Sequence, residues 1–269
     1  MSGRASRRAE LGQHFLAGGW LAAELVEQAG VGPGDLVVEI GAGTGVLTEA
    51  LARRAGRVVA VECDPRLAAR ARARLAGHGN VRVVTADALA MPAPRRPFRV
   101  VANLPFGSTA AMLRRLLGDP RSRLERADLI VQEQAARRYA ARRPGTPERI
   151  AWGAWYELGV GRRLGPGCFR PPPRVGAAVL VARRRRPPLV PVGGHRRFTR
   201  LVEGAFRHPG LPLRRGLVPP LTYRQLRRLA RDLGFPLDAR PGDLDASQWA
   251  GLHVFLSNTD DLGRVGRSP

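Results

Sequence analysis

Short apolar runs alternate with stretches of helical periodicity along the first part of the chain. Strands are predicted over 36–40, 58–62, 81–87 and 99–103, and helices over 19–30, 46–55 and 65–75. Strands that alternate with helices form a parallel sheet with right-handed crossover connections. The order of the elements therefore predicts a doubly wound α/β domain.

The pattern changes after two further apolar runs, 129–132 and 177–181, which we expect to be later strands of the same sheet. Helices are predicted over 195–206 and after the capping signatures that open at Thr222 and Asp245. The predicted organisation is a flexible basic arm (1–10), the α/β domain (11–183), a linker (184–193), a small all-helical domain (194–258) and a disordered tail (259–269).

A glycine-rich loop and two acidic residues follow the first three predicted strands. The loop E-I-G-A-G-T-G carries Gly41, Gly43 and Gly45, and the next two predicted strands end in Glu62 and Asp87. A dinucleotide loop has the spacing G-x-G-x-x-G, so this tighter G-x-G-x-G spacing favours a ligand without a pyrophosphate, such as S-adenosylmethionine. Glu62 is expected to accept hydrogen bonds from ribose hydroxyls, and Asp87 from the adenine amine. Taken alone, the loop is also compatible with a structural turn.

The fourth predicted strand ends in Asn103, Leu104, Pro105 and Phe106. The Asn103 side-chain oxygen and the Leu104 carbonyl form a pair of acceptors that can take both N–H bonds of an adenine amine. Pro105 stiffens the turn, and Phe106 can stack on the base, which is worth roughly 1–3 kcal/mol. The base must be unpaired or flipped out to reach such a pocket. An isolated N-L-P-F is equally compatible with a turn beside a core aromatic.

The charge of the chain indicates a polyanionic partner. The 269 residues include 45 basic residues, all of them arginine, against 22 acidic residues, and the formal net charge is +23. An excess of this size repels itself unless a polyanion is present, and nucleic acid is the first candidate. Arginine pairs are expected to contact RNA phosphates at Arg137, Arg138, Arg142, Arg143, Arg214 and Arg215.

Other classes of partner find no support in the sequence. Cys63 and Cys168 lie far apart and the five histidines form no ligand cluster, so we expect no metal site. No apolar stretch reaches the roughly 18–20 residues that span a bilayer, and no secretory signal is visible. A cytoplasmic protein with free thiols and no membrane partner is expected.

Six motifs occur along the chain in an order that is typical of one protein family. They are G-Q-H-F-L, E-I-G-A-G-T-G-V-L-T, V-E-C-D, A-D-A-L, N-L-P-F and C-F-R-P-P-P-R-V. From about Leu11 to about Phe255 the chain resembles the ribosomal RNA adenine N6-methyltransferases. This resemblance implies a Rossmann-like methyltransferase fold with S-adenosylmethionine as cofactor. Of its two branches, N-L-P-F-G-S-T resembles the Erm enzymes, whereas the small-subunit dimethyladenosine transferases usually read N-L-P-Y-N-I-S.

The Erm resemblance implies methylation of one adenine of 23S rRNA at the peptide exit tunnel, before complete assembly of the 50S subunit. It also implies a monomeric enzyme that confers macrolide–lincosamide–streptogramin B resistance. By motif, the cofactor-binding residues would be His14, Leu16, Gly41, Gly43, Gly45, Glu62, Asp87, Ala88 and Asn103. The residues at the target base would be Asn103, Leu104, Phe106 and Phe169. Two positions depart from the family pattern, since His14 stands where many relatives have Asn, and Gly176 where relatives often have Asp or Asn.

Two alternatives stay open. A small-subunit dimethyladenosine transferase would modify 16S rRNA, and a non-catalytic RNA-binding scaffold would bind cofactor without turnover. A DNA adenine methyltransferase is disfavoured because its tetrapeptide begins with Asn or Asp followed by two prolines. A nicotinamide oxidoreductase is disfavoured by the glycine spacing and the charge.

Overall fold

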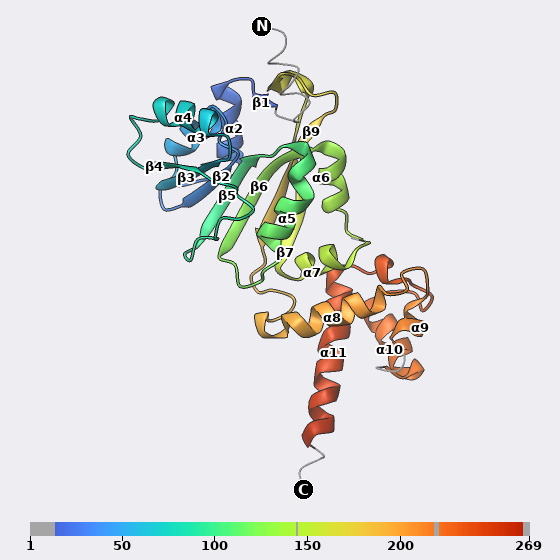
Figure 1. The fold of residues 1–269 in the computed structure, drawn as a ribbon. Helices are drawn as coiled ribbons and strands as arrows, with labels where there is room; N and C mark the ends of the chain where they lie inside the picture. The colour runs from blue at the N-terminus through green and yellow to red at the C-terminus, as the bar shows by residue number, and fades with distance from the viewer. Residues whose placement is uncertain (1–13, 144, 218–220, 266–269) are drawn as a thin grey trace. The chain divides into compact units, whose positions relative to one another are not determined.

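The computed structural model describes residues 14–143, 145–217 and 221–265. The chain divides into two compact units. The first comprises residues 1–140 and 158–183, and the second comprises residues 141–157 and 184–269. Figure 1 shows the labelled strands and helices of both units.

A seven-stranded sheet in the order β4-β3-β2-β5-β6-β9-β7 forms the centre of the first unit. Five strands run parallel, and β9 pairs with β6 in the antiparallel direction. The strands are β2 (Leu36–Ile40), β3 (Arg57–Glu62), β4 (Val81–Thr85), β5 (Phe98–Asn103), β6 (Leu124–Gln132), β7 (Tyr156–Leu164) and β9 (Ala177–Arg184).

Helices cover both faces of this sheet. They are α2 (Gly19–Gln28), α3 (Val46–Ala52), α4 (Pro65–Arg74), α5 (Thr109–Leu117) and α6 (Glu133–Tyr139). Val37 and Val101 pack in one core cluster with residues of α2 and α3. Val38 and Val100 point to the other face, where they line a small cavity together with Leu116 of α5. Side chains alternate between the faces of a strand, so this division is the one expected of a doubly wound sheet.

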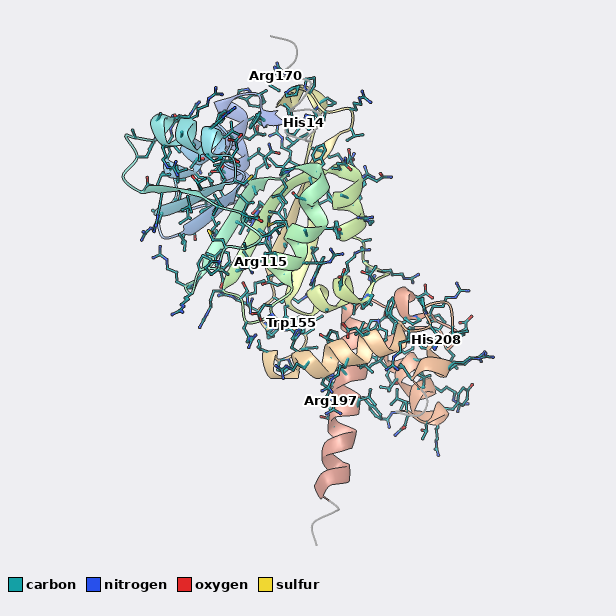
Figure 2. The ribbon with its side chains drawn as sticks, viewed as in Figure 1. His14, Arg115, Trp155, Arg170, Arg197 and His208 are labelled. Atoms are coloured by element: carbon teal, nitrogen blue, oxygen red, sulfur yellow. The ribbon has the colours of Figure 1, made fainter. Side chains whose placement is uncertain are left out.

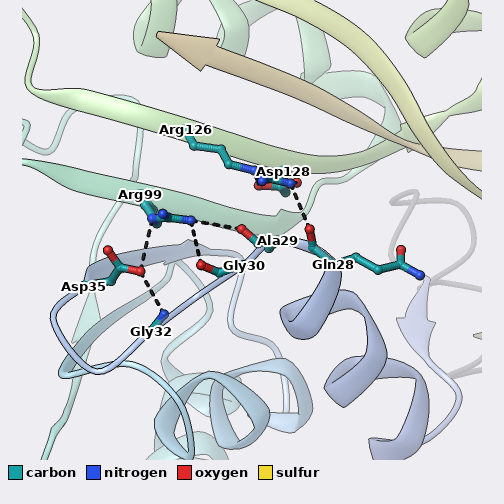
Figure 3. A network of polar contacts seen from close by, with 8 residues as sticks. All are labelled: Gln28, Ala29, Gly30, Gly32, Asp35, Arg99, Arg126 and Asp128. Atoms are coloured by element: carbon teal, nitrogen blue, oxygen red, sulfur yellow. Dashed lines mark hydrogen bonds and ion pairs between the residues drawn. The ribbon is translucent and has the colours of Figure 1, made fainter.

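The C-terminal end of α2 is tied to the sheet by two arginines (Figure 3). Arg99 Nη1 of β5 donates to the carbonyls of Ala29 and Gly30 at 2.9 and 3.0 Å. Arg126 Nη2 of β6 donates to Gln28 O at 3.0 Å and also binds Asp128 at 2.7 Å. The last carbonyls of a helix have no partners within it, and cations are favoured there. These bonds therefore fix α2, which directly follows the N-terminal motif.

The second unit is built from helices. These are α7 (Pro147–Trp155), α8 (His195–Ala205), α9 (Leu213–Gly216), α10 (Tyr223–Leu233) and α11 (Ala246–Val265). Trp155 of α7 lies 5.1 Å from His195 and 5.9 Å from Phe198 between ring centroids. Phe198 in turn lies 5.6 Å from His253 of α11. Edge-to-face contacts between these aromatic rings hold α7, α8 and α11 together.

The structure confirms the strands predicted over 36–40, 58–62 and 99–103 within one residue, and both capping signatures. Thr222 and Gln225 form a reciprocal capping box, and Gln248 N donates to Asp245 Oδ1 at 3.0 Å. The arm over 1–10 lies outside the described residues. Two boundaries differ from the expected organisation, as residues 141–157 cluster with the second unit and α11 continues to Val265. The first difference follows from the packing of α7 on α8 and α11.

Candidate functional site

The glycine-rich loop connects β2 to α3 at the carboxyl end of the sheet. Gly41, Gly43 and Gly45 all have positive φ values, of 79°, 57° and 83°. Such a backbone strongly favours glycine. A Cβ on Gly43 would stand 2.7 Å from the ring of Phe15, so this position also requires glycine for packing. Gly43 and Gly45 are buried against protein atoms, and Gly41 is the glycine of this turn that is exposed.

Glu62 ends β3 and is only 4% exposed. Its Oε2 accepts a hydrogen bond from Gly43 N at 2.8 Å, and its Oε1 accepts one from Asp64 N at 2.9 Å. Cys63 Sγ also donates weakly to Oε1, at 3.6 Å. An ionised carboxylate has about four acceptor positions, so Glu62 keeps the capacity to accept about one more donor. The carboxylate thus joins the glycine loop to the end of the neighbouring strand.

Glu39 of β2 is a second acid, buried to 1% exposure beneath the same loop. Burial raises the pKa of Glu39 to about 8, opposed by the nearby Thr48 hydroxyl and reinforced by the charge of Glu62. Its Oε2 has no hydrogen-bond partner among the described residues. A buried carboxyl of this kind is neutral at pH 7 in the unliganded protein.

Asp87 lies two residues beyond the end of β4, not at the strand end where the sequence analysis placed it. It is exposed, and its Oδ1 accepts a hydrogen bond from Leu89 N at 2.8 Å. Arg115 of α5 holds the same loop, since its Nε donates to Leu89 O at 3.2 Å and its Nη2 to Met91 O at 2.5 Å (Figure 2). The sequence pattern missed Arg115, because no helix was predicted over Thr109–Leu117; the signal available was the apolar spacing of Met112, Leu113 and Leu117.

Asn103 ends β5 beside the glycine loop, and a Cβ on Gly41 would lie 3.6 Å from its carbonyl oxygen. Its Nδ2 donates to His14 O at 2.6 Å. Within the described residues, neither Asn103 Oδ1 nor the Leu104 carbonyl accepts a hydrogen bond. The donor end of the amide is thus occupied, while the two acceptors proposed for the target amine have no protein donor.

His14 connects three of the sequence motifs. Its carbonyl accepts from Asn103, its Nδ1 donates to Pro171 O at 2.9 Å, and its ring centroid lies 5.5 Å from that of Phe106. His14 departs from the family pattern, and its imidazole is held by contacts with Pro171 and Phe106, which belong to two other motifs. Figure 2 labels His14.

Phe169 lies in the short strand β8 (Phe169–Arg170), which pairs with β1 (Phe15–Leu16). Leu16 is its direct neighbour across the pair, and both side chains belong to the hydrophobic core cluster. Phe169 has no exposed surface. Its contact with a target base therefore stays a prediction. Gly176, the second departure, accepts a hydrogen bond from Glu133 N at 3.0 Å.

The six arginines proposed for RNA contacts are all exposed. Two of them bind carboxylates, since Arg137 lies 2.7 Å from Glu133 and Arg142 lies 3.3 Å from Asp245. Arg138 stacks over the ring of Tyr139 at 5.0 Å. The others are Arg143, Arg214 and Arg215. Exposure is what phosphate contact requires, and the assignment itself stays a prediction.

The described residues offer neither a metal site nor a membrane-spanning helix. They hold no group of three or more His, Cys, Asp or Glu side chains that could bind a metal ion. No helix in the described part of the chain combines the length and the apolar character needed to cross a bilayer.

Comparison with known proteins adds four likenesses. A family model described as ribosomal RNA adenine dimethylase matches residues 4–234. An rRNA adenine N-6-methyltransferase of Bacillus licheniformis is 31% identical over 243 residues, which are 89% of this chain and 83% of that protein. The ribosomal RNA small subunit methyltransferase A of Rubrobacter xylanophilus is 38% identical over 267 residues, which are 96% and 98% of the two chains. Among solved structures, the 23S rRNA methyltransferase ErmE matches with a TM-score of 0.78 and 30% identity, covering 90% of this chain and 99% of that one.

Proposed function

The chain belongs to the ribosomal RNA adenine dimethylase family and is an S-adenosylmethionine-dependent rRNA adenine N6-methyltransferase, and from this premise we propose that it methylates one adenine of 23S rRNA at the peptide exit tunnel. The modification would take place on rRNA before the 50S subunit is complete. It would confer resistance to macrolides, lincosamides and streptogramin B antibiotics.

The residues at the carboxyl end of the sheet fit S-adenosylmethionine. Gly41 is exposed at the end of β2, Glu62 keeps an acceptor position, and within the described residues the buried Glu39 Oε2 has no hydrogen-bond partner. We propose that Gly41, Gly43 and Gly45 approach the amino-acid half of the cofactor. Glu62 would accept from the ribose hydroxyls.

The remaining proposed cofactor contacts lie around this loop. Asp87 and Ala88 would bind the adenine ring on the loop that Arg115 holds. His14, Leu16 and Asn103 would close the opposite side, where His14 accepts from the Asn103 amide. When bound, the cofactor supplies a methyl group on a sulfonium.

The target amine would be held by Asn103 and Leu104. The amine of adenine is a poor nucleophile because its lone pair is delocalised into the ring. Two acceptors that take both N–H bonds draw the nitrogen toward a tetrahedral geometry and localise the lone pair. Asn103 Oδ1 and Leu104 O have no donor among the described residues, and the bond from Asn103 Nδ2 to His14 O fixes the side chain. Positioning and electrostatics then lower the barrier, without a strong general base.

Phe106 would stack on the flipped base, and Phe169 would help to close the pocket. The tilted contact between His14 and Phe106 limits the freedom of the Phe106 ring. Phe169 would have to gain exposed surface to reach the base, since it has none without substrate. A non-catalytic scaffold would be expected to carry a defect in the element from Asn103 to Phe106. This element is intact in the chain, so the scaffold alternative finds no support.

One observation carries the 23S assignment, namely the N-L-P-F-G-S-T element in a chain that matches ErmE over 99% of that structure. The likeness to a small-subunit methyltransferase over 96% of this chain supports 16S rRNA as the second candidate. An experiment has to separate the two substrates.

The test is expression in a macrolide-sensitive bacterium, followed by primer extension on both rRNAs. We expect resistance, and a stop at the tunnel adenine of 23S rRNA that is absent with the Asn103→Ala variant. Susceptible cells with an unmodified tunnel adenine would contradict the 23S assignment. Modification of 16S rRNA in those cells would establish the second candidate.

A further inference from the structure

The solvent side of α10 carries an unbroken row of arginines. Arg224, Arg227, Arg228 and Arg231 are all exposed and follow each other at spacings of three, one and three residues. Positions three and four apart share one face of a helix. We call these four residues the α10 arginine stripe. The opposite face carries Leu226, Leu229 and Ala230, which are 1%, 8% and 3% exposed.

The helix presents this stripe rigidly, because both of its ends are fixed. Gln225 Oε1 accepts from Thr222 N at 2.8 Å, and Thr222 Oγ1 accepts from Gln225 N at 3.3 Å. At the other end, Gly234 has the left-handed conformation, with φ 70°. Capping of both ends and burial of the apolar face hold the guanidinium groups on a defined surface.

The charge of the stripe is not balanced by the protein around it. Arg228 and Arg231 both approach Asp232, at 3.5 and 3.4 Å. Arg224 and Arg227 form no ion pair with any residue that the structure describes. One carboxylate thus serves four guanidinium groups, which repel each other unless an anion lies between them.

A shallow cavity of about 850 Å³ lies along the stripe. It is lined by Thr222, Gln225 and the four arginines, so every lining side chain in the described part of the chain can donate a hydrogen bond. From the first arginine to the last, the helix rises about 10 Å at 1.5 Å per residue. This length suits two or more neighbouring phosphates of a nucleic acid backbone.

We propose that the α10 arginine stripe binds the phosphate backbone of the rRNA substrate, at a segment other than the target adenine. Guanidinium groups bind phosphate through two parallel hydrogen bonds, and contacts of this kind position an RNA without reading its sequence. A membrane surface fits the stripe less well, since the apolar face of α10 is buried and cannot enter a bilayer. The proposal rests on the proposed function only in the choice of RNA used to test it.

The test compares Arg224→Gln/Arg227→Gln with the unaltered protein in binding to a large 23S rRNA fragment that contains the target region. We expect the Kd to rise about tenfold near 0.1 M salt. The negative slope of the logarithm of the association constant against the logarithm of the salt concentration should become shallower by about 1 to 2. The kcat at saturating RNA should stay unchanged. A matched control is Arg53→Gln/Arg54→Gln, which removes two charges that lie 2.6 and 3.6 Å from carboxylates. It should move the slope less.

Three outcomes would overturn the proposal. These are a salt slope equal to that of the unaltered protein, an equal change in the control variant, and weakened binding to vesicles of anionic phospholipid with RNA binding intact. Binding to a 16S fragment is measured in parallel. If the protein methylates 16S instead of 23S rRNA, the proposed function fails, while the slopes on the 16S fragment still test the stripe.

Discussion

At the scale of single residues, the buried carboxyl of Glu39 makes stability depend on pH. The pKa of Glu39 is about 8 in the folded protein, against an ordinary value of 4.5. Between these values the unfolded chain releases the proton that the folded chain keeps, so the free energy of unfolding falls as pH rises. Glu39→Gln removes this loss, and we expect it to stabilise the cofactor-free protein by a few kcal/mol at pH 8 and hardly at all at pH 4.5.

Urea unfolding at both pH values measures this difference. Glu49→Gln on α3 is the matched control, because the hydrogen bond from Arg74 lowers the pKa of Glu49. A lowered pKa stabilises the fold above the ordinary value, so this variant should lose a little stability at pH 8. Parallel pH profiles for Glu39→Gln and the unaltered protein would show that Glu39 is ionised in the fold.

His14 contacts Asn103 and Phe106, two residues of the proposed target site. His14→Ala removes a hydrogen bond to Pro171 and the ring contact with Phe106, which together are worth about 1–3 kcal/mol. If part of that energy holds the target base, kcat for methyl transfer should fall about tenfold. His14→Asn should recover part of the rate, because its amide can donate to the same carbonyl. Steady-state kinetics measures kcat for these variants, with His208→Ala, at an exposed histidine, as the control. An equal loss of kcat in the control would show that the effect does not depend on the position of His14.

At the scale of elements, the arginines beneath α2 should stabilise the first unit. Arg126→Met leaves Asp128, whose side chain is 8% exposed, without its bound cation, and frees the Gln28 carbonyl. We expect the free energy of unfolding in urea to drop by about 2–4 kcal/mol. Arg126→Met/Asp128→Leu should cost less than the single change, because no buried charge remains. Arg121→Met, at an exposed pair, should cost under about 1 kcal/mol, and an equal loss there would contradict the assignment.

The elements that the sequence revealed are those with a simple periodic signal. The strands Leu36–Ile40 and Phe98–Asn103 are apolar runs buried on both faces, and the helix Tyr223–Leu233 has a capping box and a glycine end. The strand Tyr156–Leu164 was not predicted, since it carries three glycine or arginine residues in a row at 161–163 and has exposed positions. The pair Phe15–Leu16 with Phe169–Arg170 joins distant segments, and pairing of this kind leaves no periodic trace.

The residues of the candidate site also divide into those that the sequence could place and those that it could not. Gly41, Glu62 and Asn103 could be placed because strand order alone brings the ends of parallel strands to one edge. The role of His14 as a bridge, and of Arg115 as the clamp of the loop after β4, depend on side-chain contacts over 89 and 24 residues of sequence. No local pattern contains such contacts.

At the scale of the whole molecule, the excess of arginine should make the protein more stable in salt. With 45 basic and 22 acidic residues, at least 23 arginines (45 − 22) have no carboxylate of their own. Their repulsion opposes the compact state, and salt screens it, with a Debye length of about 10 Å at 0.1 M and about 3 Å at 1 M. Salt also weakens exposed ion pairs, but each is worth only about 0–1 kcal/mol. Repulsion should therefore dominate, and we expect Tm to rise by several degrees between about 0.1 and 0.5 M sodium chloride.

Replacing the four arginines of the α10 arginine stripe by glutamine lowers the formal charge from +23 to +19 (23 − 4), and should flatten this rise in a calorimetric scan. A Tm that falls with salt would mean that ion pairs outweigh the net charge, and would remove the argument that the chain needs a polyanion.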